Sequence, residues 1–537
     1  MIEDFKILIG KGENPVYLLP QMANRHGLIA GATGTGKTTT LKVLAEGFSD
    51  LGVPVFLADV KGDISSMAEA GEMNEKISSR LDGMGVDKSL FDPHAYPVRF
   101  WDVFETGGIP VRAKISSIGP TLFSRLLNLT DAQTGVLNIT FHVADDNGLE
   151  LIDLKDLRSM LTYISKNRAE LTATYGNVAS SSVGAIQRAL LTLEDQGGNM
   201  FFGEPELDIR DWLKTDENGR GMVNILHCPE LVKYPLLYSM FMLWMLSELY
   251  ETLPEVGDVD VPKIVYFFDE AHMLFNGAPK ALLDKVVQIV KLVRSKGVGI
   301  YFITQSPADI PDEVLAQLNN RVQHALRAYT PAEQRAVRTA AQSFRANPKF
   351  KTEDAIANMG TGVALVSMLD EEGAPTVVEQ ATICPPQSSF TALVNEEREQ
   401  IVNDDPLYAS YKEGVDSESA YEILNAEQEK IDAAKAEADA QKAAEAEAKA
   451  AEKAERDAEK AKQAQYKAEG KDKYGRTQLQ QSIAKASKST ARVIGRDVGK
   501  SITRGLLGTS KIGKTAQNAA GQMVGSLFSE ALNNLFK

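Results

Sequence analysis

Residues 27–38 read GLIAGATGTGKT and say more about this chain than any other segment. Residues 31–38 fit the pattern G-x-x-x-x-G-K-[ST], with an apolar strand candidate before them and a predicted helix, residues 39–47, after them. A strand, this loop and a helix in that order indicate a phosphate-binding P-loop rather than an ordinary glycine-rich turn. We predict a nucleotide site made by Gly31, Thr33, Gly34, Thr35, Gly36, Lys37, Thr38 and Thr39.

Each part of this loop has a physical role. Glycines let backbone N–H groups turn inward around phosphates, and the helix N-terminus adds partial positive charge. Lys37 is expected to reach the β- and γ-phosphates, and Thr38 to ligate Mg²⁺. Residues 508–515 match the same pattern, but no buried strand precedes them, so we interpret that match as chance.

A second signal is the apolar run Ile264–Phe268, which ends in Asp269 and Glu270. The carboxyl ends of strands are where α/β sheets bind ligands. Asp269 is therefore predicted to hold Mg²⁺, and Glu270 to activate the attacking water as a general base. The alternative is an exposed acidic turn after a core strand. The adjacent acid favours hydrolysis over phosphoryl transfer to a small substrate.

Two further segments are expected at the same sheet edge. Gln305 follows the apolar run Val298–Thr304, where its amide could sense the γ-phosphate or orient water, although a helix cap or turn is the alternative. The sequence DVKGD, residues 59–63, follows another strand candidate. It is predicted to line the site, with a structural turn as the alternative.

Short apolar runs alternate with helical segments across residues 1–385, which indicates an α/β fold with a mostly parallel sheet. Residues 120–198 have helical periodicity and no clear strand, so we predict a helical insertion. The strand candidates are residues 5–9, 27–30, 53–59, 98–103, 222–226, 264–268, 298–304, 322–327 and 363–368.

Composition limits the classes of protein. The 537 residues are 43% apolar and 24% charged, which is typical of globular chains. The longest apolar run, residues 235–247, is shorter than the ~18 residues of a membrane span and predicts a buried helix. No signal peptide is visible, and two cysteines support neither a disulfide framework nor a zinc cage. We expect a cytoplasmic protein without zinc or haem.

The C-terminal part differs in composition. Residues 387–425 are expected to be helical with a break at Asp405–Pro406, and residues 426–468 are almost only Ala, Glu, Lys, Asp and Gln. The second segment predicts a long helix ended by Gly470 and Gly475. It is either a solvated single helix or a coiled coil, and the small Ala side chains favour the first.

Charge is distributed unevenly. Residues 471–537 carry twelve basic and three acidic residues, a net charge of +9, which leaves −24 on the remainder. The acidic body should not attract nucleic acid by bulk charge, whereas the tail could bind the phosphates of lipid or nucleic acid. An amphipathic stripe at residues 523–536 could dock on the body, pair with another subunit or lie on an anionic membrane.

These observations predict the following organisation. Residues 1–119 and 199–386 form the two parts of an ATPase core around the insertion at 120–198. A helical extension at 387–425, the Ala/Glu/Lys-rich helix at 426–470 and the basic amphipathic tail at 471–537 follow.

Together, Arg25-His26, GATGTGKT, DVKGD, YFFDEAH and FITQ resemble, in this order, the HerA/FtsK branch of P-loop motor ATPases. Residues 182–191, 405–408 and 418–424 resemble its bacterial YjgR-type, HerA-like subgroup, and the resemblance covers about residues 1–425. It implies a RecA-like (ASCE) fold and a hexameric ring with nucleotide between subunits.

The resemblance also implies an arginine from the neighbouring subunit in each site. Arg294 matches that position, with Lys296, Arg321 and Arg327 as alternatives, and Arg25 matches a position near the phosphates. Because 30 residues precede Gly31, we expect no N-terminal β-barrel of the archaeal HerA kind. We also find no winged-helix pattern of the kind that reads DNA in FtsK-type translocases.

The sequence therefore predicts a Mg²⁺-dependent ATPase that hydrolyses ATP at residues 31–39. One hypothesis for its use is a ring-shaped motor that translocates on DNA or remodels it. The alternative is an ATP-switched assembly or scaffold protein that acts on protein or membrane partners through its C-terminal helix and tail. A P-loop kinase is disfavoured by Glu270 and by the lack of an evident acceptor-binding module.

Overall fold

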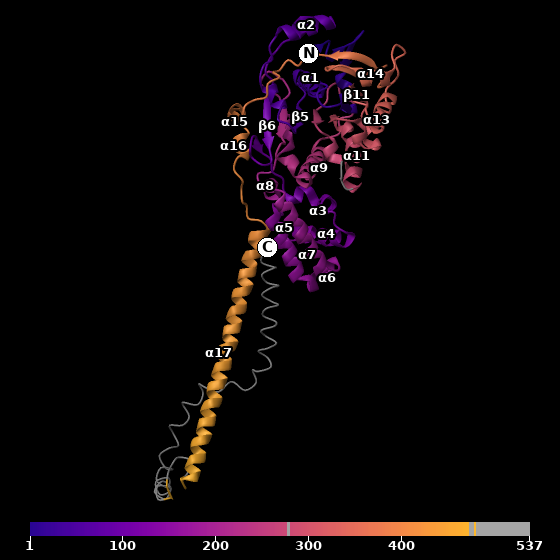
Figure 1. Cartoon of the computed structure of the whole chain (residues 1–537). Helices are drawn as coiled ribbons and strands as arrows, with labels where there is room; N and C mark the ends of the chain where they lie inside the picture. The colour runs from indigo at the N-terminus through magenta and orange to yellow at the C-terminus, as the bar shows by residue number, and fades with distance from the viewer. Residues whose placement is uncertain (276–279, 472–476, 479–537) are drawn as a thin grey trace. The chain divides into compact units, whose positions relative to one another are not determined.

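The computed structural model describes residues 1–275, 280–471 and 477–478. The chain divides into two units, Met1–Leu424 and Asn425–Lys537 (Figure 1). The amphipathic stripe and the second P-loop-like match lie outside the described residues, as do nearly all residues of the basic tail. The finer division of the chain into domains stays a prediction.

One 13-stranded sheet organises the first unit. Its order is β1-β2-β13-β12-β11-β4-β10-β9-β5-β8-β6-β7, with β3 paired to β2, and all strands from β11 to β7 in this order are parallel. The strands are β1 Ile2–Glu3, β2 Lys6–Lys11, β3 Pro15–Leu18, β4 Gly27–Ala30, β5 Val55–Asp59, β6 Val98–Asp102, β7 Ile109–Pro110, β8 Val223–His227, β9 Ile264–Phe268, β10 Val298–Thr304, β11 Asn320–His324, β12 Val363–Ser367 and β13 Glu379–Ile383.

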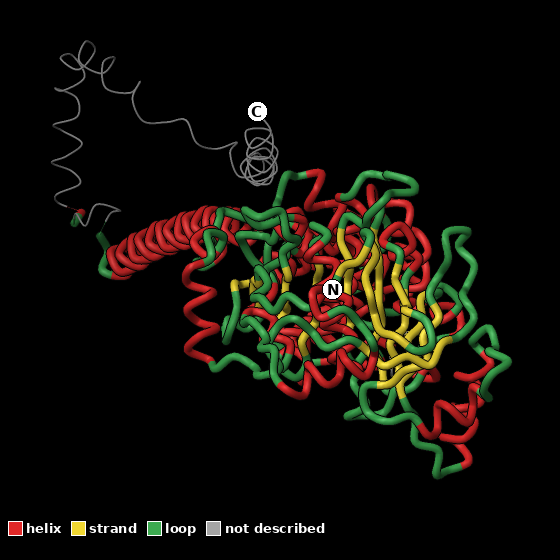
Figure 2. Tube along the Cα trace, turned by 90° about the horizontal axis from the view of Figure 1, so that it is seen from above, coloured by secondary structure: helices red, strands yellow, loops and turns green. Residues whose placement is uncertain are grey.

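Helices surround the strands of this unit, as the tube in Figure 2 shows. They are α1 Lys37–Asp50, α2 Glu75–Met84, α3 Ile115–Leu126, α4 Asp131–Asp146, α5 Leu154–Lys166, α6 Arg168–Tyr175, α7 Ser180–Asp195, α8 Gly198–Phe201, α9 Pro235–Thr252, α10 His272–Phe275, α11 Lys280–Leu292, α12 Asp312–Leu315, α13 Pro331–Gln342, α14 Thr352–Asn358, α15 Asn395–Asp404 and α16 Tyr408–Tyr411. Helices α3 to α8 form the predicted helical insertion between β7 and β8. The parallel sheet and the insertion confirm the predicted RecA-like (ASCE) α/β fold.

The core fixes the P-loop helix against the sheet. Phe48 of α1 packs with its ring centroid 6.3 Å from that of Phe267 on β9 and 6.2 Å from that of Tyr301 on β10. All three side chains are buried. The apolar helix α9 is also buried, as predicted. Within the described part of the chain, no helix is long and apolar enough to cross a membrane.

Several predicted boundaries were wrong, and three of them have a clear physical reason. The strand predicted at 322–327 is β11, Asn320–His324, and the chain leaves the sheet after it, where the Leu326 N–H donates to the Ile356 carbonyl of α14 at 3.1 Å. The strand predicted at 5–9 is β2, and it begins one residue later than predicted, at Lys6, because Phe5, with φ +63°, lies in the turn between β1 and β2. Residues 387–394 are not helical, since the Gln387 and Ser388 N–H groups bind the buried Glu46 carboxylate. Sequence analysis also missed β1, β3, β7 and β13.

The long helix, α17 Ala420–Ala468, begins six residues before its predicted start. Ser419 donates from its backbone and its hydroxyl to the Glu422 carboxylate, an arrangement that stabilises a helix start. Across residues 425–468 nearly every side chain is exposed, and Lys449 pairs with Glu445 at 3.8 Å. Gly470, with φ +72°, follows its end.

Candidate active site

The carboxyl ends of four parallel strands bring the predicted segments together. Ala30 at the end of β4 is in register with Thr304 of β10, and Phe302 of β10 with Phe268 of β9. Strand β5 lies beside β9, with Ala58 opposite Phe268. The P-loop, Gln305, the acid pair and residues 59–63 therefore follow neighbouring strands at one edge of the sheet.

Backbone bonds hold the first two residues of the P-loop, and a glycine stands at its other end. Gly31 donates to the Thr304 carbonyl at 3.2 Å, and Ala32 to the Ala325 carbonyl at 2.9 Å. Gly36 lies at the N-cap of α1 with φ +113°, a conformation that favours glycine. Thr33 and Gly34 at the tip are exposed, and Thr35, Thr38 and Thr39 are half-buried. The loop is thus anchored while its tip and the first turn of α1 stay accessible.

Lys37 folds back on the loop. Its Nζ donates to the carbonyls of Gly31 at 2.6 Å and Ala32 at 3.2 Å, and the residue is buried. Burial lowers its pKa, while the charges of Glu270 and Asp269 act in the opposite direction. Lys37 and the acid pair follow neighbouring strands at the same edge of the sheet.

Asp269 and Glu270 are both buried, but their pKa values are shifted in opposite directions. Burial raises the pKa of Asp269 to about 6, partly offset by Lys61. Burial also acts to raise the pKa of Glu270, but the hydrogen bond and charge of Lys61 outweigh it, so that this pKa is lowered. Lys61 Nζ lies 2.8 Å from Glu270 Oε1 and 4.0 Å from Asp269 Oδ2. Glu270 has φ +48°, an uncommon conformation for a non-glycine residue.

Gln305 contacts the predicted base. Its Nε2 lies 3.4 Å from Glu270 Oε2, and His272 Nδ1 lies 3.3 Å from the same oxygen. Asp59 ends β5 and accepts N–H bonds from Gly62 at 2.7 Å and Ile64 at 3.1 Å. Asp59 therefore shapes the turn that carries Lys61, and Lys61 brings this motif to the acid pair.

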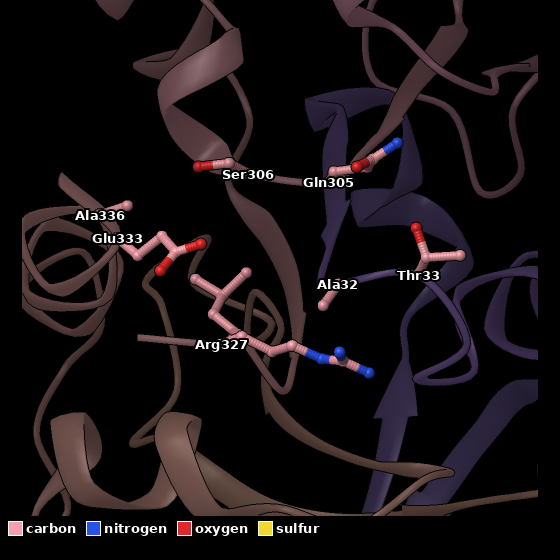
Figure 3. Close-up of a pocket in the computed structure, with 8 residues that line it drawn as sticks. Ala32, Thr33, Gln305, Ser306, Arg327, Glu333 and Ala336 are labelled. Atoms are coloured by element: carbon pink, nitrogen blue, oxygen red, sulfur yellow. The ribbon is translucent and has the colours of Figure 1, made fainter. Parts of the chain in front are cut away.

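A cavity of 440 Å³ opens beside the P-loop (Figure 3). Ala32 and Thr33 border it on the P-loop side, and Gln305 and Ser306 follow β10. Figure 3 shows the Arg327 side chain extending toward the P-loop side, with Glu333 of α13 across the cavity. Arg327, one alternative for the trans arginine, thus faces the P-loop of its own chain.

The structure does not bring Arg25 or Arg294 to this P-loop. Arg25 precedes β4 and Arg294 lies in the 3-10 helix Val293–Lys296 before β10, so both lie at the amino edge of the sheet. The four residues of β4 span about 13 Å at ~3.3 Å per residue. Both arginines line one cavity of 220 Å³ together with Lys291. In its own chain, Arg25 is not placed to bind the nucleotide at Gly31–Thr39.

The other two alternatives for the trans arginine are engaged within the chain. Lys296 Nζ donates to the Leu253 carbonyl and lies 4.7 Å from the Tyr250 ring centroid. Arg321 donates to three backbone carbonyls, including that of Leu318 at 2.8 Å. Neither side chain projects freely from the surface.

Sequence reasoning missed two parts of the site. His324 is buried under the loop, where its Nε2 lies 2.8 Å from Thr40 Oγ1 and burial lowers its pKa to about 4. Residues 360–362 cross the loop, where Gly362 donates to the Thr35 carbonyl at 2.9 Å. Neither could be found by motif, because each contact joins segments about 300 residues apart in the sequence.

The sheet, the P-loop and the acid pair at one edge define the chain as a P-loop ATPase. The model of the family described as "Helicase HerA-like C-terminal" matches residues 4–516. The chain therefore belongs to this HerA-like family. None of the curated proteins compared with the chain matches it.

Solved structures with a similar fold include two forms of one protein. The bacterial conjugative coupling protein TrwB in an unbound form shares 15% identity over 73% of this chain and 93% of that chain, with a TM-score of 0.47. TrwB in complex with ADP and Mg²⁺ shares 16% identity over 72% of this chain and 92% of that chain, with a TM-score of 0.46. VirB4 of Thermoanaerobacter pseudethanolicus shares 16% identity over 71% of this chain and 97% of that chain, with a TM-score of 0.45.

Proposed function

We propose that the chain binds ATP with Mg²⁺ at its P-loop and hydrolyses it with a water activated by Glu270. One observation carries the proposal: Lys37, Asp269, Glu270 and Gln305 follow neighbouring strands at a single edge of the sheet. Nucleotide hydrolysis needs these groups together, since it depends on positioning and on charge stabilisation.

The residues of the loop fit a triphosphate with its metal. Gly34 has φ +76°, and a Cβ added there would meet nothing within 4 Å, so its surroundings leave room for a ligand. Thr38 in the first turn of α1 and the Asp269 carboxylate would hold Mg²⁺, whose charge offsets that of the phosphates. Lys37 would exchange its bonds to the loop carbonyls for bonds to the β- and γ-phosphates.

In the reaction, the oxygen of a water forms a bond to the γ-phosphorus while the bond from that phosphorus to the ADP oxygen breaks. Glu270 accepts a proton from this water. Gln305, whose Nε2 lies 3.4 Å from Glu270 Oε2, orients the water. The products are ADP and inorganic phosphate, and the proton on Glu270 returns to solvent.

Glu270→Gln tests the assignment of the base. The variant keeps the shape of the side chain but not its basicity, so nucleotide affinity should persist while turnover falls at least ~100-fold. Glu353→Gln is the matched control, because Glu353 is an exposed acid paired with Arg338 at 3.5 Å. Equal turnover in Glu270→Gln and wild type would remove Glu270 from this role.

We also propose that identical subunits assemble head to tail, in a hexamer by family resemblance, so that Arg25 and Arg294 reach the nucleotide of the neighbouring subunit. Their position at the sheet edge opposite their own P-loop supports this. An arginine supplied in trans stabilises charge on the γ-phosphate in the transition state.

Subunit mixing tests the shared site. Arg294→Ala subunits mixed with Glu270→Gln subunits should regain part of the activity, because some interfaces then combine an intact arginine with an intact base. Mixed assemblies verified by two affinity tags but without regained activity would refute a trans role for Arg294.

We propose that this assembly is a motor acting on DNA. Membership in a family described as helicase HerA-like supports this use. ATP turnover should rise with double-stranded DNA, and the stimulation should fade with added salt because phosphate contacts release counterions. Lys37→Ala is the blank. Turnover that DNA leaves unchanged at every salt concentration would contradict a DNA motor.

The second candidate function is an ATP-switched scaffold. The observation that favours it is α17, a 49-residue helix whose side chains from residue 425 onward are nearly all exposed. Such a helix presents a long surface, as a single helix or a coiled coil, to protein partners or an anionic membrane. Deleting residues 471–537 should then reduce binding to anionic vesicles, whereas loss of DNA binding alone would favour the motor.

A further inference from the structure

Lys61 has no part in the reaction described above, yet it contacts the acid pair directly. It lies in the turn after β5, with its Nζ 2.8 Å from Glu270 Oε1 and 4.0 Å from Asp269 Oδ2. Its side chain is 45% exposed, whereas those of Glu270 and Asp269 are 9% and 8% exposed. Lys61 is therefore a cation with access to solvent, placed over two buried carboxylates.

This contact occupies the proposed base. Lys61 engages one Glu270 oxygen, while Gln305 at 3.4 Å and His272 at 3.3 Å lie at the other. A carboxylate oxygen engaged by an ammonium group is a poor acceptor for the proton of a water. Glu270 Oε1 can take that proton only after Lys61 has moved away.

A second acceptor lies in the same turn. Asp63 Oδ1 is buried and has no hydrogen-bond partner among the residues that the structure describes. Burial acts to lower the pKa of Lys61, but the hydrogen bond of Glu270 and the charges of Asp269, Glu270 and Asp63 outweigh it, and Asp63 stands two residues from Lys61 in this turn. Gly62 between them has φ +80° and would meet nothing within 4 Å with an added Cβ. The turn thus offers the ammonium group another position.

We propose that Lys61 is a positioning residue: it is the counter-ion that neutralises Asp269 and Glu270 when no metal is bound, and it releases Glu270 when the nucleotide arrives with Mg²⁺. The inference rests on the proposed ATPase site. It adds to that site an exchange of one cation for another over the same two carboxylates.

The test is the effect of Mg²⁺ on nucleotide affinity. ADP dissociation constants are measured by calorimetry in EDTA and in Mg²⁺ for wild type, Lys61→Met and Lys61→Arg. Without Lys61, the carboxylates repel metal-free phosphates and attract Mg²⁺ more strongly. In Lys61→Met the ratio of the constant in EDTA to the constant in Mg²⁺ should therefore rise at least tenfold, the effect of one unit charge ~12 Å away at an effective dielectric constant of ~20. Lys61→Arg should keep the wild-type ratio.

Two further variants isolate the charge effect. Lys88→Met removes an equally exposed lysine, 42% exposed and paired with Asp82 at 2.7 Å, and should keep the wild-type ratio. In the double variant Lys61→Met/Glu270→Gln, the rise should be smaller than in Lys61→Met alone because one carboxylate charge is gone. If Lys61→Met does not fold, Lys61→Gln takes its place.

The outcomes separate the two proposals. A wild-type protein that binds no ADP in either buffer refutes the nucleotide site itself, and the inference with it. A wild type that binds ADP while Lys61→Met keeps the same ratio refutes only the role of Lys61. An equal rise in Lys88→Met also refutes it, because the effect would then follow net charge rather than position.

Discussion

The segment that crosses the P-loop provides a sharp test of how the nucleotide site is held. Gly362 donates to the Thr35 carbonyl at 2.9 Å, and its own carbonyl accepts a bond from Arg80 at 2.7 Å. Arg80 also binds the Ile383 carbonyl through two nitrogens, at 2.9 and 2.7 Å. We predict that Gly362→Ala loosens the P-loop because the new methyl group displaces Arg80.

The magnitude follows from the geometry. Gly362 has φ +76°, and an alanine in that region costs ~1–2 kcal/mol. An added Cβ would lie 2.7 Å from an Arg80 guanidinium nitrogen, which cannot be kept. Loss of one hydrogen bond from a charged group costs ~1.5–3 kcal/mol, so the two effects together cost about 2.5–5 kcal/mol. Even ~2 kcal/mol of this corresponds to a roughly 30-fold increase in local opening.

Hydrogen exchange measures this opening directly. In Gly362→Ala, amides of residues 31–40 and 359–366 should exchange roughly 30-fold faster or more, and ADP affinity should fall with them. Gly360→Ala is the control, because Gly360 is exposed and an added Cβ there would meet nothing within 4 Å. Equal exchange of these amides in both variants and wild type would refute the reasoning that residues 360–362 hold the P-loop.

Three further predictions concern stability. Asp405→Asn should lower the free energy of unfolding in urea by about 3–5 kcal/mol, because Asp405 pairs with Arg99 at 2.7 Å and both are nearly buried, whereas Asp82→Asn at the exposed pair with Lys88 should change it little. Burial, with the charges of Asp63 and Asp269, raises the pKa of Asp59 from 3.8 to about 7. Protonated Asp59 therefore contributes its full stability below pH 3.8, and this contribution is lost as the pH rises through about 7. Asp59→Asn should make the fall in stability with rising pH smaller. If the urea midpoint of Asp59→Asn changes between these pH values as it does in wild type, the raised pKa of Asp59 is contradicted. Thr40→Val should cost ~1–3 kcal/mol in urea by leaving the buried His324 nitrogen unpaired, and Thr40→Ser should restore it; no loss in Thr40→Val would contradict the importance of this bond.

The strands of the site could be predicted because their signals are local. The apolar runs before Gly31, Asp269 and Gln305 are each buried on both faces of the sheet, so they stand out without any knowledge of their neighbours. The rule that carboxyl ends of parallel strands meet at one edge then gathers their polar residues. The family resemblance added the RecA-like order, which the topology confirmed.

The edges of the sheet could not be predicted in the same way. Strands β1 and β7 have two residues each, too few for a periodic pattern, and β13 reads EQATI with mixed polarity. The contacts of His324 and Gly362 with the P-loop depend on tertiary structure alone. Residues 387–394 have a composition compatible with a helix, but the buried Glu46 carboxylate binds their N–H groups and keeps them extended.

Arg25 shows most clearly how sequence distance misleads. It stands six positions before Gly31, and the resemblance placed it near the phosphates. The strand β4 separates the two, however, so Arg25 and Gly31 lie at opposite ends of that strand, at opposite edges of the parallel sheet. Arg294 and Arg25 line the same cavity at that edge although 269 positions separate them in the sequence. If both arginines serve a nucleotide, it is that of another subunit, and the complete site requires two copies of the chain.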